Sequence, residues 1–440
     1  MKKVVKFGGS SLADAHQFVK VGDIIRSELS RRYVIPSAPG KRFPEDTKVT
    51  DMLYHCYAVA EAGEEDFRPY LAAIKERYDE IIKGLQMAFS LDEEFRIIEQ
   101  KFEEKAGVDY AASRGEYLNG RVLASYIGYD FIDPAEVIIF KEDGTYDEEI
   151  TESRLKKRLS ASEHAVIPGF YGAYEDGRIH TFSRGGSDIT GSIVASACNA
   201  DLYENWTDVS GVMVTDPRIV KNPEIIDVVT YAELRELSYM GASVLHEDAV
   251  FPVRKAGIPI NIRNTNAPAD SGTMIVANTS VKPRFGITGI AGHKGFISIN
   301  IEKDMMNSEV GFGRRVLQAI EEAGVSFEHM PSGIDTMSVY VNQHGFEEHE
   351  QQILSKIRRW CDPDLIELET DLALIAVVGR GMKKSYGTAA RVFAALAHAG
   401  INVRMIDQGS SEKNIIIGVE NKDFELATQS IYDVFVNVEL

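Results

Sequence analysis

The sequence predicts an α/β protein in which one large domain with a mostly parallel sheet precedes two smaller α+β modules. Strand-like runs alternate with helical segments in the first part of the chain, and each run ends near a glycine-rich or polar loop. Residues 252–283 are rich in Pro, Asn, Ser and Thr, and we expect a domain boundary near their end. The remainder of the chain carries an internal repeat with a constant offset.

The first domain, expected at residues 1–283, opens with a β-branched strand, Val4–Phe7, which ends at a glycine pair. An amphipathic helix from about Leu12 to Arg32 and a second strand, Tyr33–Ile35, follow. This order of strand, glycine turn, helix and strand is typical of a parallel sheet. A strongly charged stretch with the periodicity of a helix predicts a helical, lid-like subregion at 64–135. Further strands are expected at Asp130–Ile132, Val137–Phe140, Ala165–Pro168, Ile179–Phe182 and Leu202–Trp206.

The repeat aligns Gly311–Val325 with Gly387–Ile401 without gaps, at an offset of 76 residues. Each copy reads as a helix closed by a glycine, then a strand, a loop and another strand, which predicts two βαββαβ-like modules at 284–365 and 366–440. Two unrelated amphipathic helices are the alternative, but they would hardly keep register through helix, loop and strand together. The expected strands are Val325–Met330, Met337–Val341, Ile401–Ile406 and Lys413–Val419.

Length and composition restrict the class of protein. A chain of 440 residues suggests about three domains, and 44% hydrophobic residues suffice for packed cores. The formal net charge of −19 repels phosphate backbones and argues against a nucleic-acid-binding protein. The three cysteines lie far apart and no HExxH pattern occurs, so neither a disulfide framework nor a protein-built metal site is expected. Without a signal peptide or an apolar run of about 18 residues, a soluble, cytoplasmic protein without membrane contact is expected.

The segment from Lys6 to Ser11, Lys-Phe-Gly-Gly-Ser-Ser, combines a cation, a glycine pair and the start of a helix. These features suit a phosphate group, because glycines allow close approach and unusual φ/ψ angles, and backbone amides converge on the anion. The alternative is a plain strand-to-helix turn, with Lys6 extending along the sheet and Ser11 and Asp14 forming a capping box. An ordinary P-loop is excluded because the chain contains no GxxxxGK[ST].

A second glycine turn, Phe182–Asp188, lies between an expected strand and a helix from about Ile189 to Cys198. Arg184 offers a planar fork for a carboxylate or phosphate, and Asp188 would organise a lysine or a magnesium-bound phosphate. The alternative makes Asp188 a helix N-cap and leaves Arg184 on a surface loop.

Two weaker motifs accompany these turns. Ser113-Arg114-Gly115-Glu116 precedes an expected helix, Tyr117–Tyr126, and matches a capping box, which alone would explain Glu116. Trp206–Val209 and Val214–Arg218 place polar residues after a strand, where either a nucleotide contact or an ordinary turn is possible.

In this order the four motifs resemble those of the aspartate kinases, within the amino-acid kinase superfamily, over essentially the whole chain. The repeat, with Ile406–Glu412 after its second copy, is similar to the tandem ACT domains of that family. Kinases of acetylglutamate, carbamate or UMP share the fold but lack a tandem ACT tail. The resemblance implies an amino-acid kinase fold, with its sheet sandwiched by helices, followed by two ferredoxin-like ACT domains.

The implied activity is phosphorylation of the β-carboxylate of L-aspartate by ATP, with Mg²⁺ held mainly by the nucleotide phosphates. The product, 4-phospho-L-aspartate, would enter lysine, threonine and methionine synthesis. A carboxylate with a pKa of about 4 is already ionised at neutral pH, so its phosphorylation needs no general base. Catalysis then requires alignment and charge neutralisation, and the lack of a catalytic His or Cys is expected.

By this resemblance, Lys6 with the amides of Gly8 and Gly9 would neutralise the transferring phosphoryl group, and Asp188 would orient Lys6. Arg184 would bind the α-carboxylate of aspartate and Glu116 its ammonium. The other implied substrate contacts are Ser37, Thr50 and Ser187, and the implied ATP contacts are Ser10, Thr207, Asp208, Met213, Arg218, Ser243 and Val244.

One departure from the family concerns the segment Gly241–His246, in which Ser243 stands where relatives often have a lysine that contacts nucleotide phosphates. The loop from Pro36 to Val49 is also longer than in many relatives. Lys41 or Arg42 on that loop would supply the missing charge under this hypothesis.

The resemblance also implies an amino-acid sensor and a homodimer formed through the ACT domains, with a tetramer possible. Helix N-terminal amides near Gly311 suit an effector carboxylate, and Glu328 would suit an ammonium, which slightly favours lysine over threonine. The alternative is that Glu328 is a solvated strand residue. The implied effector contacts are Asn307, Ser308, Gly311, Phe312, Glu328 and Ser332.

Two other functions remain open at this point. An amino-acid kinase of the same fold would act on a different carboxylate, which a substrate panel would reveal. A binding protein with a decayed kinase site would sense amino acids without turnover, and Ser243 is the feature that supports it.

Overall fold

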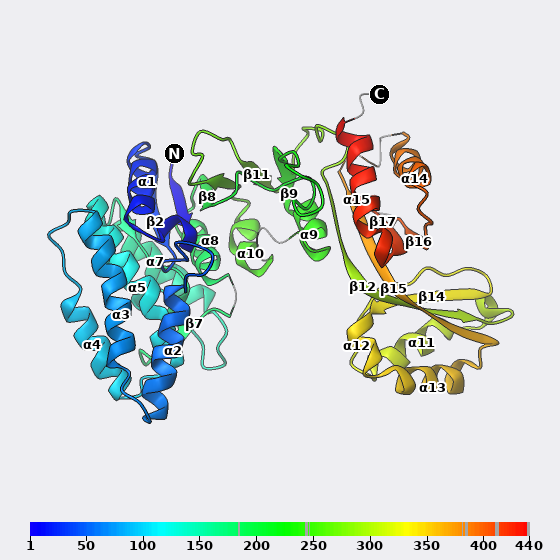
Figure 1. The fold of residues 1–440 in the computed structure, drawn as a ribbon, viewed down its shortest axis with the longest axis horizontal. Helices are drawn as coiled ribbons and strands as arrows, with labels where there is room; N and C mark the ends of the chain where they lie inside the picture. Colours follow the sequence, from blue (N-terminus) through cyan, green and yellow to red (C-terminus); the bar gives the residue numbers. More distant parts are fainter. Residues whose placement is uncertain are drawn as a thin grey trace. The chain divides into compact units, whose positions relative to one another are not determined.

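The computed structural model describes residues 1–437 except 184, 243, 244, 246, 381, 383–385 and 410–412 (Figure 1). The chain forms two compact units. Unit 1 consists of Met1–Val212, Ile225–Tyr231 and Val244–Thr279, and unit 2 of Met213–Glu224, Ala232–Ser243 and Ser280–Leu440. The change of unit after Thr279 lies close to the boundary expected near residue 283, but two earlier segments also pack with unit 2.

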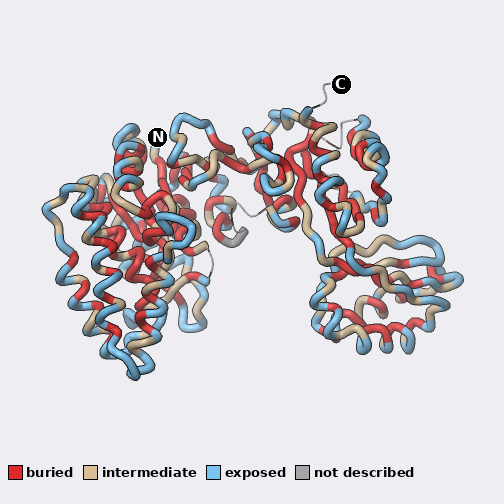
Figure 2. The backbone as a smooth tube through the Cα atoms, viewed as in Figure 1, coloured by how far each residue is buried: buried red, intermediate tan, exposed pale blue. Residues whose placement is uncertain are grey.

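Unit 1 is built on an eight-stranded sheet with the order β3-β5-β2-β1-β8-β10-β11-β9. All neighbouring strands are parallel except β10 and β11, which confirms the predicted sheet class. The strands are β1 (Lys3–Phe7), β2 (Arg31–Pro36), β3 (Asp130–Phe131), β5 (Ala165–Val166), β8 (Leu202–Thr207), β9 (Val228–Thr230), β10 (Ile260–Asn264) and β11 (Thr273–Val276). Every residue of β1 is buried, as expected for a central parallel strand covered on both faces (Figure 2).

A three-stranded sheet in unit 1 contains β4 (Ile139–Phe140), β6 (Tyr171–Tyr174) and β7 (Ile179–Thr181). The strand expected at Val137–Phe140 was only half correct, because Pro134–Val137 form the short helix α6. Asp133 caps this helix by accepting a hydrogen bond from the Ala135 amide, and Pro134 stands at a position where proline favours a helix start.

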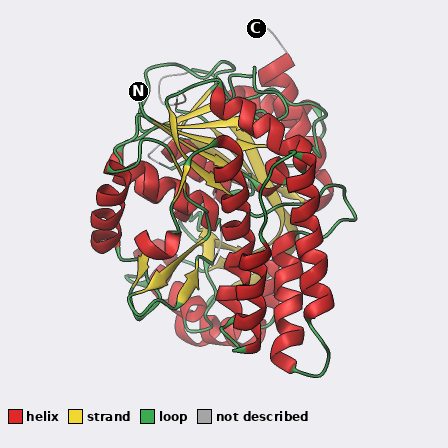
Figure 3. Ribbon diagram, turned by 90° about the vertical axis from the view of Figure 1, so that its left-hand side faces the viewer, coloured by secondary structure: helices red, strands yellow, loops and turns green. Residues whose placement is uncertain are grey.

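The helices of unit 1 include four long ones, α2–α5, which pack side by side (Figures 1 and 3). The bounds are α1 (Ala15–Arg26), α2 (Val49–Ala62), α3 (Arg68–Gly84), α4 (Asp92–Glu103), α5 (Val108–Ile127), α7 (Glu148–Ser160), α8 (Gly186–Ala197) and α10 (Glu247–Ala256). The helix α9 (Tyr231–Tyr239) lies almost wholly in the 232–243 segment of unit 2. In the part of the chain that the structure describes, no helix has the length and apolar character needed to cross a membrane.

Two sequence expectations about helix starts were wrong. Gly9–Leu12 form a 3₁₀ turn, so α1 begins at Ala15 rather than near Leu12, after Asp14 has capped the Gln17 amide. The capping box proposed for Ser113 and Glu116 does not exist, because both residues lie inside α5. The alanine-rich sequence before Ser113 is already helical, and the N-cap of α5 is Gly107.

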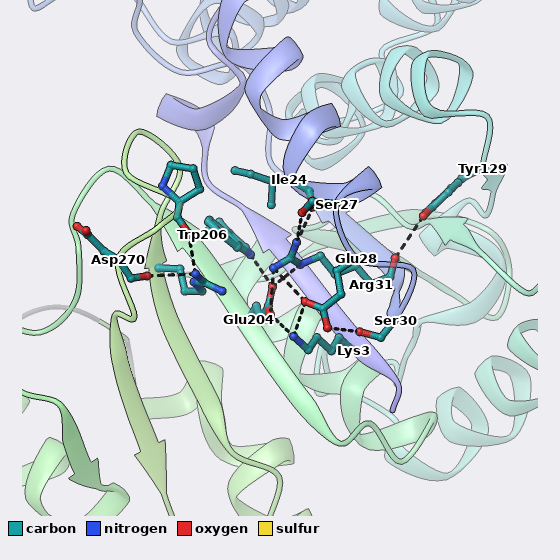
Figure 4. Close-up of polar contacts among 12 residues, drawn as sticks. Lys3, Ile24, Ser27, Glu28, Ser30, Arg31, Tyr129, Glu204, Trp206 and Asp270 are labelled. Atoms are coloured by element: carbon teal, nitrogen blue, oxygen red, sulfur yellow. Dashed lines mark hydrogen bonds and ion pairs between the residues drawn. The ribbon is translucent and has the colours of Figure 1, made fainter.

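A buried carboxylate connects the three central strands of unit 1 (Figure 4). Glu204 on β8 is fully buried and pairs with Lys3 of β1 at 2.9 Å and with Arg31 of β2 at 2.8 Å. It also accepts a hydrogen bond of 2.9 Å from the indole nitrogen of Trp206. Burial opposes ionisation of Glu204, but the hydrogen bonds and charges of Arg31 and Lys3 outweigh it and lower its pKa. The cluster therefore holds β1, β2 and β8 in their alignment.

Unit 2 contains a six-stranded antiparallel sheet with the order β13-β14-β12-β15-β17-β16. Its strands are β12 (Gly289–Glu302), β13 (Phe327–His329), β14 (Thr336–Asn342), β15 (Leu365–Val378), β16 (Met405–Asp407) and β17 (Asn414–Glu420). Its helices are α11 (Phe312–Glu321), α12 (Gln343–Glu347), α13 (Glu350–Cys361), α14 (Thr388–His398) and α15 (Phe424–Tyr432). The expected strands at Val325–Met330 and Ile401–Ile406 shrink to the three-residue β13 and β16.

The two copies of the sequence repeat form the two halves of this sheet. β12 and β15 have 14 residues each and pair with one another along their whole length, from Gly289 with Val378 to Glu302 with Leu365. The repeated helices α11 and α14 both begin after a glycine with positive φ, Gly311 at 82° and Gly387 at 85°. This equivalence confirms the pair of α+β modules.

Candidate active site

The first glycine turn follows β1 and places Lys6 at the carboxyl end of the sheet, where parallel α/β sheets bind ligands. The Gly8 amide donates to the Trp206 carbonyl at 3.0 Å and so continues the pairing of β1 with β8. A Cβ on Gly9 would lie only 2.8 Å from the Ala38 carbonyl. Neither glycine has positive φ, so close approach, rather than an unusual φ, is what requires glycine at position 9.

The second glycine turn converges on the first. Gly185, with φ of 58°, begins α8, and Asp188 in its first turn pairs with the Lys6 ammonium at 2.7 Å. The side-chain amide of Asn205 donates to the same Asp188 oxygen at 2.7 Å. Asn205 on β8 pairs in register with Lys6 on β1, so both side chains leave the sheet on the same face. Asp188 is therefore not the N-cap that the alternative interpretation required.

The loop after β2 packs directly on the first glycine turn. The Ser37 amide donates to the Phe7 carbonyl at 3.0 Å, and the Gly40 amide donates to the Gly9 carbonyl at 2.8 Å. Thr50, in the first turn of α2, lies against Gly115 of α5. These contacts bring Ser37 and Thr50 to the same end of the sheet as Lys6.

Glu116 and Asn119 project from α5 toward this loop. Glu116 is 6% exposed and Asn119 is fully buried. Oε2 of Glu116 and Oδ1 of Asn119 have no hydrogen-bond partner, while the Asn119 amide nitrogen donates to the Ser37 carbonyl at 2.6 Å. Burial raises the pKa of Glu116 to about 8. Buried polar atoms are nearly always paired, so two unpaired acceptors indicate a place prepared for donors from a ligand.

The expected nucleotide residues of unit 1 gather after β8. The Thr207 hydroxyl donates to the Asp208 carboxylate at 3.2 Å, and the Thr207 carbonyl accepts from the Thr265 amide. The Thr265 hydroxyl lies 2.8 Å from the Ser11 hydroxyl, which ties this edge to the first glycine turn beside Ser10. Thus Ser11 bonds with Thr265 instead of taking part in the capping box that the alternative required.

Several predicted residues lie elsewhere. Met213 and Arg218 belong to unit 2, where the strongly exposed Arg218 pairs with Asp216 at 2.6 Å. Arg184, Ser243 and Val244 lie outside the described residues. Ser187 of α8 is buried against Gly169.

Arg42 and Lys41, the cations proposed to replace a lysine at position 243, already have hydrogen-bond partners in the structure. Arg42 pairs with Asp46 at 2.9 Å and with Glu80 at 3.1 Å, and Lys41 donates to the Pro44 carbonyl. The hydrogen bond from Arg42 lowers the pKa of Asp46. Arg42 would have to leave two carboxylates to reach a nucleotide, which makes the exposed Lys41 the better candidate.

Four of the predicted effector residues, Asn307, Ser308, Gly311 and Phe312, lie at or just before the start of α11 in unit 2. The Asn307 amide donates to the Ile334 carbonyl and the Ser308 hydroxyl to the Met305 carbonyl, while Gly311 is the N-cap of α11. Glu328 accepts a hydrogen bond from the Tyr239 hydroxyl, so it is not simply solvated. Phe312 is 2% exposed, and its ring belongs to the apolar core of the first module. Ser332 is exposed.

Sequence reasoning missed Asn119, Asn205 and Thr265. Asn119 carried a usable signal, because it follows Glu116 by three positions and shares its face of a helix. Asn205 and Glu204 also carried a usable signal, because they are two adjacent polar residues within an apolar strand. Thr265 carried none, since only the tertiary fold brings residue 265 to Ser11.

This arrangement separates two kinds of group at one edge of the sheet. A lysine lies beside the glycine turns, as a phosphoryl group requires, and it is held by a carboxylate that an asparagine amide fixes in turn. Buried oxygens without partners on α5 suit a cationic donor. The site is therefore suited to transfer a phosphoryl group to a small substrate that carries an ammonium.

Comparisons with known proteins agree with this chemistry. Residues 1–264 match the amino acid kinase family, and residues 375–435 match the ACT domain. Aspartokinase 3 of Bacillus subtilis is 41% identical, and the alignment covers 98% of both chains. The crystal structure of aspartate kinase from Clostridium acetobutylicum is 52% identical with a TM-score of 0.91, covering 98% of this chain and all of that one.

Aspartokinase III of Escherichia coli is more distant, at 25% identity and 99% coverage of both chains. Its complex with aspartate and ADP superposes with a TM-score of 0.73, and its complex with lysine and aspartate with 0.72. Family match, whole-chain identity and fold agree, and the chain belongs to the aspartokinases, the aspartate-phosphorylating enzymes of the amino acid kinase family.

Proposed function

We propose that this aspartokinase is a cytoplasmic enzyme that transfers the γ-phosphoryl group of MgATP to the β-carboxylate of L-aspartate, with the residue roles given below. The observation that carries these roles is the Lys6–Asp188 ion pair of 2.7 Å, which joins the two glycine turns. The complex of E. coli aspartokinase III with aspartate and ADP supports the same pair of ligands.

The transfer needs no general base. An ionised carboxylate oxygen of aspartate attacks the γ-phosphorus, the bond from that phosphorus to the bridging oxygen breaks, and ADP retains the electron pair. Lys6 and the Gly9 amide meet the charge on the transferring group. The Gly8 amide is already bonded to the Trp206 carbonyl, so we assign contact with the phosphoryl group to the Gly9 amide alone. Asp188 holds Lys6 in place.

The substrate would lie between the glycine turns and α5. Glu116 receives the ammonium of aspartate and Arg184 its α-carboxylate, while Ser37, Thr50 and Ser187 contact the remaining polar atoms. Ser37 is well placed for the reacting end because its own amide is bonded to the last residue of β1. On the nucleotide side we assign Ser10, Thr207, Asp208, Met213, Arg218, Ser243 and Val244 to ATP.

A magnesium ion in this site would be held mainly by the nucleotide phosphates. Asp188 shares one oxygen between Lys6 and Asn205, and within the described parts of the chain no three His, Cys, Asp or Glu residues cluster as metal ligands. This donor set fits a metal that arrives with the nucleotide, where it neutralises phosphate charge.

A substrate panel tests this assignment. ADP release is expected with L-aspartate and not with glutamate or acetylglutamate. The reason is that the hydrogen bond from α5 to the Ser37 carbonyl fixes the distance between Ser37 and Glu116, the two ends of the site. Turnover confined to another carboxylate would instead reveal a kinase of different specificity. Calorimetric binding of amino acids without any ADP release would identify a sensor with a decayed kinase site.

The affinity for aspartate is expected to rise with pH across the range around 8. Burial raises the pKa of Glu116 to about 8, so below that pH the unliganded site is mostly neutral and must release a proton to pair with an ammonium. The KM for aspartate should therefore fall as pH increases from 6.5 to 9, by up to about tenfold per pH unit on the acidic side. Steady-state assays across that range measure the effect.

The control for this pH dependence is Glu116→Gln, which should raise the KM for aspartate and flatten its pH profile. A Gln variant that keeps the wild-type slope would show that another group titrates. ATP KM serves as the internal reference, because Glu116 faces the amino-acid end of the site.

The C-terminal modules, which we assign to 284–365 and 366–440, would bind an end-product amino acid. We assign its carboxylate to the start of α11 near Gly311 and Phe312, with Asn307, Ser308 and Ser332 beside it, and its ammonium to Glu328. E. coli aspartokinase III forms a complex with lysine, which supports lysine over threonine. The same ADP-release assay should show inhibition by lysine, and unchanged rates with both amino acids would contradict an inhibitory sensor.

A homodimer through these modules completes the proposal, with a tetramer as a further possibility. The edge strands of the six-stranded sheet carry half-exposed apolar residues, Phe327 on β13 and Ile406 on β16. Exposed edge strands with apolar side chains are favourable sites for pairing with a second copy.

A further inference from the structure

Two side chains of α5 hold one peptide group of the loop after β2. Asn119 donates through its amide nitrogen to the Ser37 carbonyl at 2.6 Å. The Ala38 amide, which belongs to the same peptide group, donates to the Glu116 carboxylate. Glu116 and Asn119 are one helical turn apart, so they reach this peptide from the same face of α5.

This contact settles how the Asn119 side chain is oriented. The Ser37 carbonyl is an acceptor, so the nitrogen of the Asn119 amide must face it, and the oxygen must occupy the other branch. That oxygen, Oδ1, is buried and has no partner, and neither has Oε2 of Glu116. A buried amide oxygen without a hydrogen bond loses its hydration without compensation, which a structural role alone does not explain.

We infer that Asn119 is a specificity-determining residue whose Oδ1 accepts a hydrogen bond from the ammonium of the amino-acid substrate, beside Glu116. The inference rests on the proposed function, in which Glu116 binds that ammonium. An ammonium carries three N–H donors, and one carboxylate oxygen leaves donors to be satisfied in a buried site.

A neutral acceptor is the chemically suitable companion for Glu116. A second carboxylate would raise the pKa of Glu116 further and would keep the pair protonated at neutral pH. The amide oxygen adds an acceptor without adding charge. The same side chain holds Ser37, so recognition of the amine and placement of the loop that faces the reacting carboxylate depend on one residue.

The test compares aspartate with succinate, which has both carboxylates but no ammonium. Asn119→Leu keeps the side-chain volume and removes both polar atoms. The KM for aspartate is expected to rise about tenfold or more beyond any rise in the inhibition constant of succinate, which reports the loss of the Ser37 contact, while the KM for ATP stays at its wild-type value. Asn119→Asp, which retains an acceptor, should bind aspartate better than the Leu variant at high pH.

The outcomes separate the inference from the proposed function. If wild-type enzyme releases no ADP with aspartate, the proposed function fails. If wild type is active but Asn119→Leu weakens succinate and aspartate equally, or weakens neither, Asn119 only supports the loop and the inference fails. Gln100→Leu, an exposed amide on α4 that bonds with Glu104, is the matched control, and thermal unfolding of each variant verifies that it is folded.

Discussion

Lys6→Met is expected to lower kcat by about 10²–10³-fold, the effect of removing one preorganised charge from a phosphoryl- or acyl-transfer site. Lys6 is buried and bonded to Asp188 at 2.7 Å, so its ammonium is held in place before the nucleotide arrives. The KM for aspartate should change little, because in the proposed arrangement the ammonium of the substrate binds Glu116 on α5 and not Lys6. Steady-state ADP release with saturating aspartate and ATP measures the loss.

The matched control is Lys101→Met on α4, where an exposed lysine pairs with Glu104. It should leave both kinetic constants unchanged, because surface ion pairs contribute little. Wild-type kcat in the Lys6→Met enzyme would show that the phosphoryl charge is met by a different group, and the exposed Lys41 would then be the first residue to replace.

Glu204→Ala is expected to reduce the free energy of unfolding of unit 1 by about 3–5 kcal/mol, because it removes the buried carboxylate between two buried cations and leaves them only the more exposed Glu28 as a counter-charge. Lys3 and Arg31 approach Glu204 at 2.9 and 2.8 Å, and Figure 4 shows how they converge on it from β1 and β2. The chain has only two tryptophans, and Trp206 bonds with Glu204. In a Trp360→Phe background, urea unfolding followed by Trp206 fluorescence therefore reports on this unit alone.

Glu204→Gln and pH supply the controls for this effect. The pKa of Glu204 is lowered in the folded chain, so its contribution is fully present above the unfolded value of about 4.3 and is lost as pH falls through the folded value. The stability difference between wild type and the Gln variant should shrink in acid. Glu104→Ala, at the exposed C-cap of α4, should leave unfolding unchanged, and an unchanged midpoint for Glu204→Ala would contradict the role of the cluster.

The local order of elements was predictable where pattern and turn chemistry agree. The buried β1 before its glycine pair and the two copies of the repeat appear as expected, because hydrophobic period and glycine placement are properties of a short segment. The start of α5 was not. Ser113 and Glu116 match the sequence pattern of a capping box. The helix nevertheless begins earlier, at Val108, and continues past both residues, and packing against α2 stabilises it.

The active site divides in the same way. Lys6 and Asp188 were singled out because charged residues beside glycine turns are unusual, whereas the role of Glu116 came from the family resemblance, since a capping box alone would have explained it. Asn119 and Asn205 could have been noticed as polar residues on one helix face and in a buried strand, but their contacts could not be predicted, because these depend on strand register and on the distance from α5 to the loop after β2. No pattern in the sequence specifies that Asn205 lies beside Lys6.

Sequence pattern alone predicted a parallel α/β domain and two equivalent α+β modules, and the family resemblance implied a phosphoryl-transfer site around Lys6. Only the folded chain revealed which buried oxygens remain without partners, which amides are already bonded and which carboxylate aligns the central strands. The reason is physical: periodicity and turn preference act over a few residues, whereas hydrogen-bond pairing, burial and the pKa values that follow from them depend on residues far apart in sequence.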